Sequence, residues 1–152
     1  MEPRMKITSV VPDLYKAMLG VEKALQDSGL PKSTFNLIKL RASQINGCGL
    51  CVDMHAHEMR QAGESDERMW SVAAWREAPY YTAEERAALA LAEAATRIAD
   101  DPAGVPDDVW DEAADHYDEK TLATLIMAIA QINAWNRINV TIRSHAGQYR
   151  LS

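Results

Sequence analysis

The 152-residue sequence lacks the features of a disulfide-stapled or membrane-bound chain. Its only two cysteines lie three residues apart, so they cannot form the long-range cross-links of a disulfide framework. The longest apolar run, residues 122–132, is about half of the roughly 20 residues that cross a bilayer. The first ten residues have no apolar core of the kind an export signal needs. These absences predict a cytoplasmic protein that makes no membrane contact.

Positive charge is also scarce. Lysine and arginine number 16 against 22 aspartates and glutamates, which gives a formal net charge of −6. The basic residues are scattered, so no patch is available for a phosphate backbone, and we expect no nucleic-acid partner. The sequence also has no phosphate-binding glycine loop and no dinucleotide fingerprint. We therefore expect no cofactor.

Apolar residues instead recur at helical spacing along the whole chain, and nothing alternates for long enough to indicate a sheet. One stripe, for example, consists of Leu14, Met18, Val21 and Leu25. No linker or repeat divides the chain. The pattern predicts a single all-α domain over residues 1–152, compact and with about six to seven helices. The expected helices cover 13–28, 31–46, 48–63, a short stretch from 65 to the break at 78–79, 82–99, 106–117 and 119–144.

The two cysteines fall on one face of the third expected helix together with a histidine. Gly47 favours a helix that starts at Cys48, and Cys51 and His55 follow three and seven residues later. On an ideal helix the two cysteine Cα atoms lie about 5 Å apart, within the range that a disulfide tolerates. All three side chains project within about 60° of one another. The spacing predicts a dithiol that can cycle to a disulfide.

A thiol must lose its proton to become a good nucleophile. The helix N-terminus favours an anion at Cys48, and His55 is close enough to Cys51 to accept its proton. We expect a relay from His55 to Cys51 to Cys48, with Cys48 as the attacking thiol and Cys51 as its resolving partner. The reverse order stays open.

Three plainer interpretations also stay open. The cysteines could be small core residues, since free cysteine packs like a small hydrophobe. His55 could be an ordinary core or surface histidine. A zinc site could use His57 as a fourth ligand, although His57 would face away from the other three and no second cysteine pair exists. The joint pattern of Cys48, Cys51 and His55 favours the redox interpretation.

These residues carry a resemblance to a known family. The run from Leu40 to Cys48, continued through Cys51 and His55, resembles the AhpD-like alkylhydroperoxidase core of the carboxymuconolactone decarboxylase family. Residues 74–82 and 132–137 resemble other recurring stretches of that family, so the similarity runs from about 14 to 143. The resemblance implies an all-helical fold that assembles into homotrimers or homohexamers. It also implies a peroxidase that reduces hydroperoxides with electrons from a lipoyl or thioredoxin-like thiol donor.

The resemblance assigns the catalytic roles to Cys48, Cys51 and His55, but one position departs from it. Family members usually carry a glutamate twelve residues before the first cysteine, which feeds the proton relay, and here that position holds Asn36. An amide cannot act as a base. Glu58, one turn beyond His55, could orient the imidazole or accept the proton instead, or could be a solvated surface carboxylate. Asn36 and Glu58 are thus auxiliary candidates.

Five further polar or aromatic residues could lie near the thiols. On the last expected helix they are Asn133, Trp135, Asn136 and Arg137, which could line a pocket or bond neighbouring helices. Arg41 could favour the thiolate, but an ion pair with an acidic residue is the simpler expectation.

Two other functions remain open at this point. The family name points to a cofactor-free decarboxylase that uses His55 as acid or base. Loss of the relay glutamate at Asn36 allows a non-enzymatic redox sensor. The intact cysteine pair favours a thiol-dependent peroxidase over both.

Overall fold

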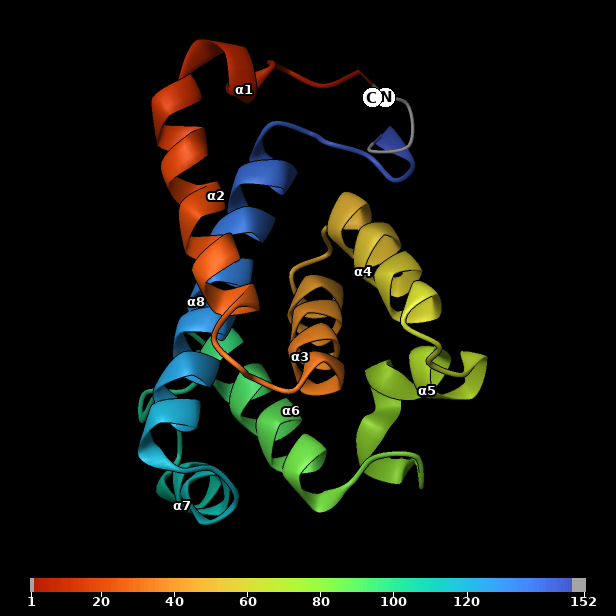
Figure 1. Ribbon diagram of the computed structural model, residues 1–152, viewed down its shortest axis with the longest axis vertical. Helices are drawn as coiled ribbons and strands as arrows, with labels where there is room; N and C mark the ends of the chain where they lie inside the picture. The colour runs from red at the N-terminus through yellow and green to blue at the C-terminus, as the bar shows by residue number, and fades with distance from the viewer. Residues whose placement is uncertain (1, 149–152) are drawn as a thin grey trace.

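The computed structural model describes residues 2–148, which form eight α-helices and one 3₁₀-helix and no strand (Figure 1). The elements are α1 (Ile7–Val10), α2 (Pro12–Gln26), α3 (Lys32–Ile45), α4 (Gly49–Gln61), α5 (Asp66–Ser71), η1 (Val72–Glu77), α6 (Ala83–Thr96), α7 (Asp107–His116) and α8 (Glu119–Thr141). All seven expected helices are present, as α2 to α8, and the all-α prediction is confirmed. The sequence pattern missed α1, and the expected helix from 65 to 78–79 is divided into α5 and η1.

Side-chain caps fix several helix starts where the sequence predicts them. Thr82 and Glu85 form a capping box at the start of α6, in which each side chain bonds the other residue's backbone N–H. The Ser65 hydroxyl accepts from the Arg68 N–H at the start of α5, and the Asp118 carboxylate accepts from the Thr121 N–H at the start of α8. Polar capping residues are therefore reliable signals in this chain.

The ends of α6 and α8 each come three residues earlier than expected. Helix α8 stops at Thr141 rather than 144, because Arg143 adopts a left-handed backbone with φ 58° and the Ser144 N–H bonds back to the Asn139 carbonyl. Because the left-handed residue is an arginine, the sequence has no glycine at this position to mark the end of the helix. Helix α6 ends at Thr96 instead of 99, before the turn that leads to Pro102.

Helix α3 is the central element of the fold (Figure 1). It packs against α4, α6 and α8, so that Thr34 to Leu40 are all buried. On one side its apolar residues join a cluster with α6, α7 and α8, and on the other they join a cluster with α4, α5 and η1. Because α3 is enclosed on several sides, its polar residues are buried together with its apolar ones.

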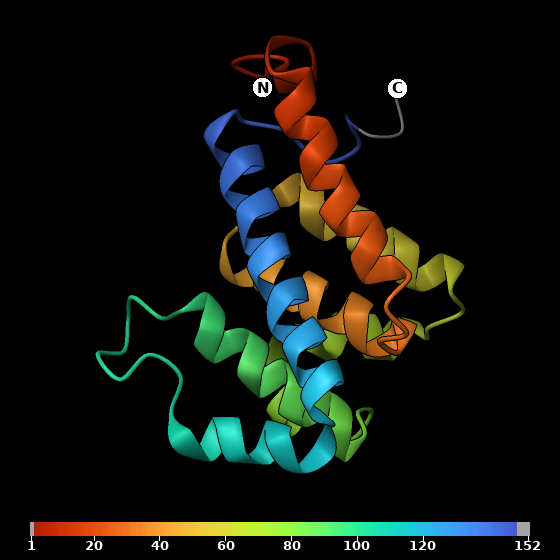
Figure 2. The ribbon, with the colours of Figure 1, turned by 60° about the vertical axis from the view of Figure 1, so that its left-hand side comes forward.

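Helices α2 and α8 lie side by side, and α4 lies across from them (Figures 1 and 2). The connection between α6 and α7 extends away from the helices (Figure 2). None of the helices in residues 2–148 combines the length and the apolarity that crossing a membrane requires.

Candidate functional site

The turn between α3 and α4 places the first cysteine. Gly47 has φ 65°, a left-handed conformation that glycine adopts without strain. The Gly47 N–H bonds the Gln44 carbonyl and the Cys48 N–H bonds the Ser43 carbonyl at 3.0 Å, which together form a Schellman motif. Cys48 is then the N-cap of α4, which begins at Gly49, one residue after the predicted start at Cys48. Cys48 therefore takes part in both the C-terminal turn of α3 and the N-terminal cap of α4.

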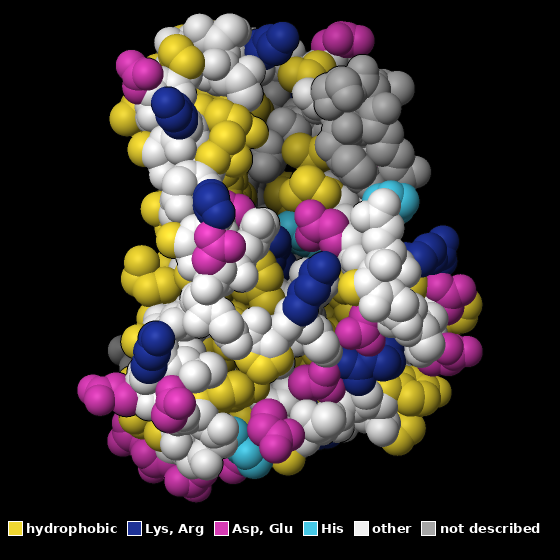
Figure 3. Space-filling view, viewed as in Figure 1, with side chains coloured by type: hydrophobic (Ala, Val, Ile, Leu, Met, Phe, Trp, Pro, Cys, Tyr) yellow, Lys and Arg dark blue, Asp and Glu magenta, His cyan; other side chains and the backbone are white. Residues whose placement is uncertain are grey.

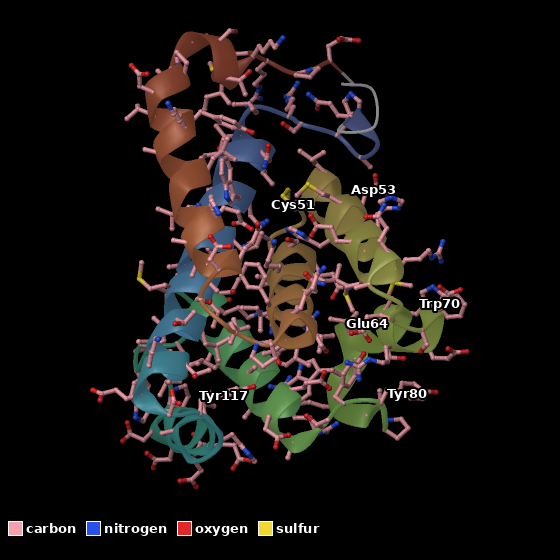
Figure 4. The ribbon with its side chains drawn as sticks, in the orientation of Figure 1. Cys51, Asp53, Glu64, Trp70, Tyr80 and Tyr117 are labelled. Carbon is pink, nitrogen blue, oxygen red and sulfur yellow. A yellow bond between two sulfur atoms is a disulfide. The ribbon has the colours of Figure 1, made fainter. Side chains whose placement is uncertain are left out.

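The two cysteines are joined in a disulfide, as their spacing allowed. Their Cα atoms lie 5.3 Å apart, and each residue is only 1% exposed. The Cys48 Sγ also accepts a hydrogen bond from the Cys51 N–H at 3.4 Å, the bond of an N-cap. Cys51 lies on the side of α4 that faces α2 and α8, and Asp53 lies on the other side (Figure 4).

His55 and Glu58 are in direct contact one turn further along α4. The His55 Nδ1 lies 2.8 Å from Glu58 Oε2, so Nδ1 carries the proton that this bond requires. The other ring nitrogen, Nε2, is buried and has no hydrogen-bond partner among the described residues. This tautomer leaves Nε2 as an acceptor.

Burial governs the charge of this histidine. His55 is 2% exposed, and the loss of hydration lowers its pKa below the ordinary value. The Glu58 hydrogen bond acts in the opposite direction but does not outweigh burial. Burial alone would raise the pKa of Glu58, but its bond to His55 and the charges of His55 and Lys39 lower it overall. Near neutral pH the pair is a carboxylate beside a neutral imidazole.

Two charged residues that the sequence analysis did not single out stand behind Glu58. The Lys39 Nζ lies 2.9 Å from Glu22 Oε1 and 3.9 Å from Glu58 Oε2. Lys39 is on α3 and Glu22 is on α2, so the charges meet only after the helices have packed. The sequence feature that could have identified Lys39 is a lysine among the apolar residues of α3.

A cavity of about 310 Å³ brings these groups together. Cys51, His55, Glu58, Lys39 and Glu22 all line it, whereas Cys48 does not. The remaining wall is largely apolar and comes mostly from α2, α4 and α8: Leu19, Leu50, Met54, Ile132, Trp135 and Ile138. Figure 3 shows acidic and basic side chains meeting in the middle of this face, next to a hollow with apolar side chains around it.

Helix α8 contributes residues on the far side of the cavity. The Asn139 amide lies 3.7 Å from the Cys51 Sγ, in the position of a weak hydrogen-bond donor to sulfur. The Trp135 ring makes an edge contact with Tyr15 of α2, at 5.4 Å between centroids. Trp135 was singled out from the sequence, but Asn139 was not, because it lies 88 residues from Cys51 along the chain.

Asn36 lies near this group but does not replace the family's glutamate. Its side chain is buried, and its Nδ2 has no hydrogen-bond partner among residues 2–148. Asn36 lines a neighbouring cavity of about 420 Å³, which shares Lys39 and Glu58 with the first. The carboxylate that meets His55 is therefore that of Glu58, not a residue at position 36 of α3.

The other residues singled out from α8 have structural roles. Asn133 and Asn136 accept from the Asn46 amide at 2.9 Å, which ties α8 to the end of α3. Asn136 also donates to the Ser43 hydroxyl, and Arg137 donates to the Asn133 carbonyl. This network holds the α3–α4 turn from behind.

Arg41 and His57 point away from the thiols. The Arg41 guanidinium pairs with Glu93 at 2.6 Å, as the simpler expectation stated. His57 lines a different hollow, beside Val52 and Trp70, in agreement with its expected direction. In the described part of the chain, no three histidine, cysteine or acidic side chains gather as a metal site would require.

The fold and the cysteine pair define a class of proteins. The model of the carboxymuconolactone decarboxylase family matches residues 12–94, and the chain belongs to this family. The uncharacterised protein YdfG of Bacillus subtilis is 38% identical over 146 residues, which cover 96% of this chain and 98% of YdfG.

Two further similarities concern the AhpD-like core. A solved structure from Agrobacterium tumefaciens, a protein of unknown function described as a candidate antioxidant defence protein AhpD, superposes with a TM-score of 0.91 at 41% identity. The match covers 95% of this chain and 98% of that one. Alkyl hydroperoxide reductase AhpD of Bradyrhizobium diazoefficiens is 49% identical over 39 residues, which span 26% of this chain and 21% of that protein. The fold is therefore AhpD-like.

Proposed function

We propose that this protein is a thiol-dependent peroxidase that cycles Cys48 and Cys51 between dithiol and disulfide. The observation that carries the proposal is the placement of Cys51 and His55 in the wall of one largely apolar cavity, with Cys48 joined to Cys51 behind it. A cavity with this wall favours an alkyl hydroperoxide over a charged substrate.

The geometry favours Cys51 as the sulfur that meets the peroxide, the reverse of the order first expected. In the reduced state the unbonded Nε2 of His55 can accept the Cys51 proton while Glu58 holds Nδ1–H. The thiolate attacks one peroxide oxygen, the O–O bond breaks, and the alcohol leaves after taking up a proton. Cys51 becomes a sulfenic acid.

Cys48 completes the cycle. Its thiol attacks the Cys51 sulfur, so that the S–S bond forms and water leaves. A donor dithiol then returns two electrons and two protons. Because the disulfide is almost fully buried, a slender lipoyl arm suits the site better than the broad surface of a thioredoxin-like protein. A dithiol cycle of this kind belongs to the reducing cytoplasm.

Consumption of cumene hydroperoxide with dihydrolipoamide as donor tests the proposal. We expect steady turnover by the wild type and none by Cys48→Ser or Cys51→Ser. After peroxide, Cys48→Ser should hold a Cys51 sulfenic acid that dimedone labels, and Cys51→Ser should not.

Other results would contradict the assignment in different ways. Labelling of Cys51→Ser alone would make Cys48 the attacking thiol. A wild type that oxidises once and is not recycled by lipoyl or thioredoxin-type donors would be a redox sensor. A double serine variant that retained full activity on a lactone would be a decarboxylase.

We also propose that the chain works as a homotrimer or homohexamer. Leu14, within the apolar stripe of α2, is 68% exposed in the single chain, and Val10 and Met127 are exposed as well. Exposed apolar side chains on neighbouring helices are typical of a subunit interface.

A further inference from the structure

Lys39 is an unusual residue for the middle of a helical bundle. It is 5% exposed, on a helix that is buried on several sides. An ammonium group in such a place is costly unless it is paired. Lys39 has two acidic neighbours, Glu22 at 2.9 Å and Glu58 at 3.9 Å, and its Nζ also lies 4.4 Å from the centre of the Phe35 ring.

These contacts extend the histidine pair into a chain of four charged or titratable groups. Glu22 of α2 binds Lys39 of α3, Lys39 faces Glu58 of α4, and Glu58 bonds His55. All four line the cavity that contains Cys51. These four side chains therefore run from α2 to His55, in the same cavity wall as Cys51.

We propose that Lys39 is a positioning residue of the dithiol site: anchored by Glu22, it keeps Glu58 ionised and held against His55, and its charge adds to burial in disfavouring a proton on His55. This inference rests on the proposed dithiol chemistry and adds a residue to it. Lys39 acts through Glu58 and His55 and does not itself meet the substrate. It compensates for the missing glutamate at position 36, because the carboxylate of the relay now comes from α4 and needs a cation behind it.

Few other titratable or charged groups face these four side chains. Helix α2 contributes Glu22 and Tyr15, and α4 contributes Glu58, His55 and Cys51. From α3, Lys32 also acts on the charge of Glu58. The cavity residues of α8 are uncharged: Ile132, Trp135, Ile138 and Asn139. On the α6 side of α3, Arg41 and Arg68 are paired with Glu93 and Glu85.

Two substitutions should move His55 in opposite directions. Lys39 disfavours a proton on His55, so Lys39→Met should raise the pKa of His55. Glu22 favours that proton, so Glu22→Gln should lower the pKa of His55. General damage to the packing would not produce shifts of opposite sign.

NMR titration of the imidazole signals tests this in the disulfide form, where no thiol titrates nearby. His55→Asn assigns the signal by its disappearance. Lys39→Arg, which keeps the charge, should restore most of the wild-type midpoint. The control is Lys23→Met, which removes an exposed lysine paired with Asp27 and should leave the midpoint unchanged.

The outcomes separate this inference from the peroxidase proposal. Unchanged His55 midpoints in Lys39→Met and Glu22→Gln, or shifts of the same sign, would overturn the role of Lys39. If Lys39→Met does not fold, the downward shift in Glu22→Gln decides alone. In the reduced protein, the pH midpoint of thiol alkylation should follow that of His55. If the His55 midpoints move as expected and alkylation does not follow, the proposed proton transfer from Cys51 to His55 fails while the role of Lys39 stands; loss of the peroxidase itself would instead appear as no turnover by the wild type.

Discussion

At the scale of single residues, the buried histidine makes the folded state sensitive to mild acid. The pKa of His55 is lower in the folded protein than the value of about 6.5 expected in the unfolded chain. Between these two values the unfolded chain binds more protons, so its share of the equilibrium grows as the pH falls. The stabilisation is fully present above about pH 6.5 and is lost as the pH falls through the folded pKa.

We therefore expect the free energy of unfolding to decrease between pH 7.5 and 5.5, and to decrease less in His55→Asn. Urea unfolding at the two pH values measures both. The window lies above the range in which the ion-paired carboxylates titrate, because the pKa values of Glu85 and Glu93 are lowered by their arginine partners despite burial. His116→Asn, at the partly exposed C-terminal end of α7, is the control. An equal decrease in His55→Asn and wild type would refute the assignment.

The residues of the site divide by how far apart they lie in sequence. Cys48, Cys51 and His55 lie within the N-cap and first two turns of a single helix, so helical geometry alone predicted their proximity. Lys39 and Asn139 approach the same cavity from other helices, and one-dimensional spacing contains no information on those distances. A lysine usually indicates the solvent-facing side of a helix, but α3 is enclosed by other helices, so this inference is wrong for Lys39.

At the scale of elements, the α3–α4 turn depends on its left-handed glycine. A Cβ on Gly47 would meet no atom within 4 Å, so the cost of Gly47→Ala is that of the backbone conformation alone, about 1–2 kcal/mol. Gly49 also has open space but does not have a positive φ, so Gly49→Ala should stay within about 1 kcal/mol of wild type. Denaturant unfolding of the two variants compares them. Equal destabilisation would show that the turn is not strained by a side chain.

Local signals predicted helix starts better than helix ends. Ser65, Thr82 and Asp118 each cap a helix through their own side chains, so the residue type itself indicates a helix N-terminus. The end of α8 depends on a left-handed Arg143, whose conformation is imposed by the fold. The short α1 has no side-chain cap and no buried residue, which explains why no pattern marked it.

At the scale of the whole molecule, we expect assembly through the exposed apolar face of α2. Light scattering after size exclusion should give three or six times the 16.9 kDa of one chain. Leu14→Glu places a charge on this face and should shift the protein to smaller species with unchanged helical circular dichroism. Lys16→Glu, which changes charge on the same helix without removing apolar surface, is the control. A wild type that is monomeric at micromolar concentration would contradict the assembly.

The shared position of Cys48 has a consequence for how this sequence can vary. Cys48 is both the last residue of the turn after α3 and the N-cap of α4, so no linker residue separates that turn from α4. Substitutions near the turn change local energies, but an inserted or deleted residue between 43 and 51 would rotate Cys51 and His55 by about 100° relative to the helix that anchors them. Homologous chains can therefore differ in composition here far more freely than in length.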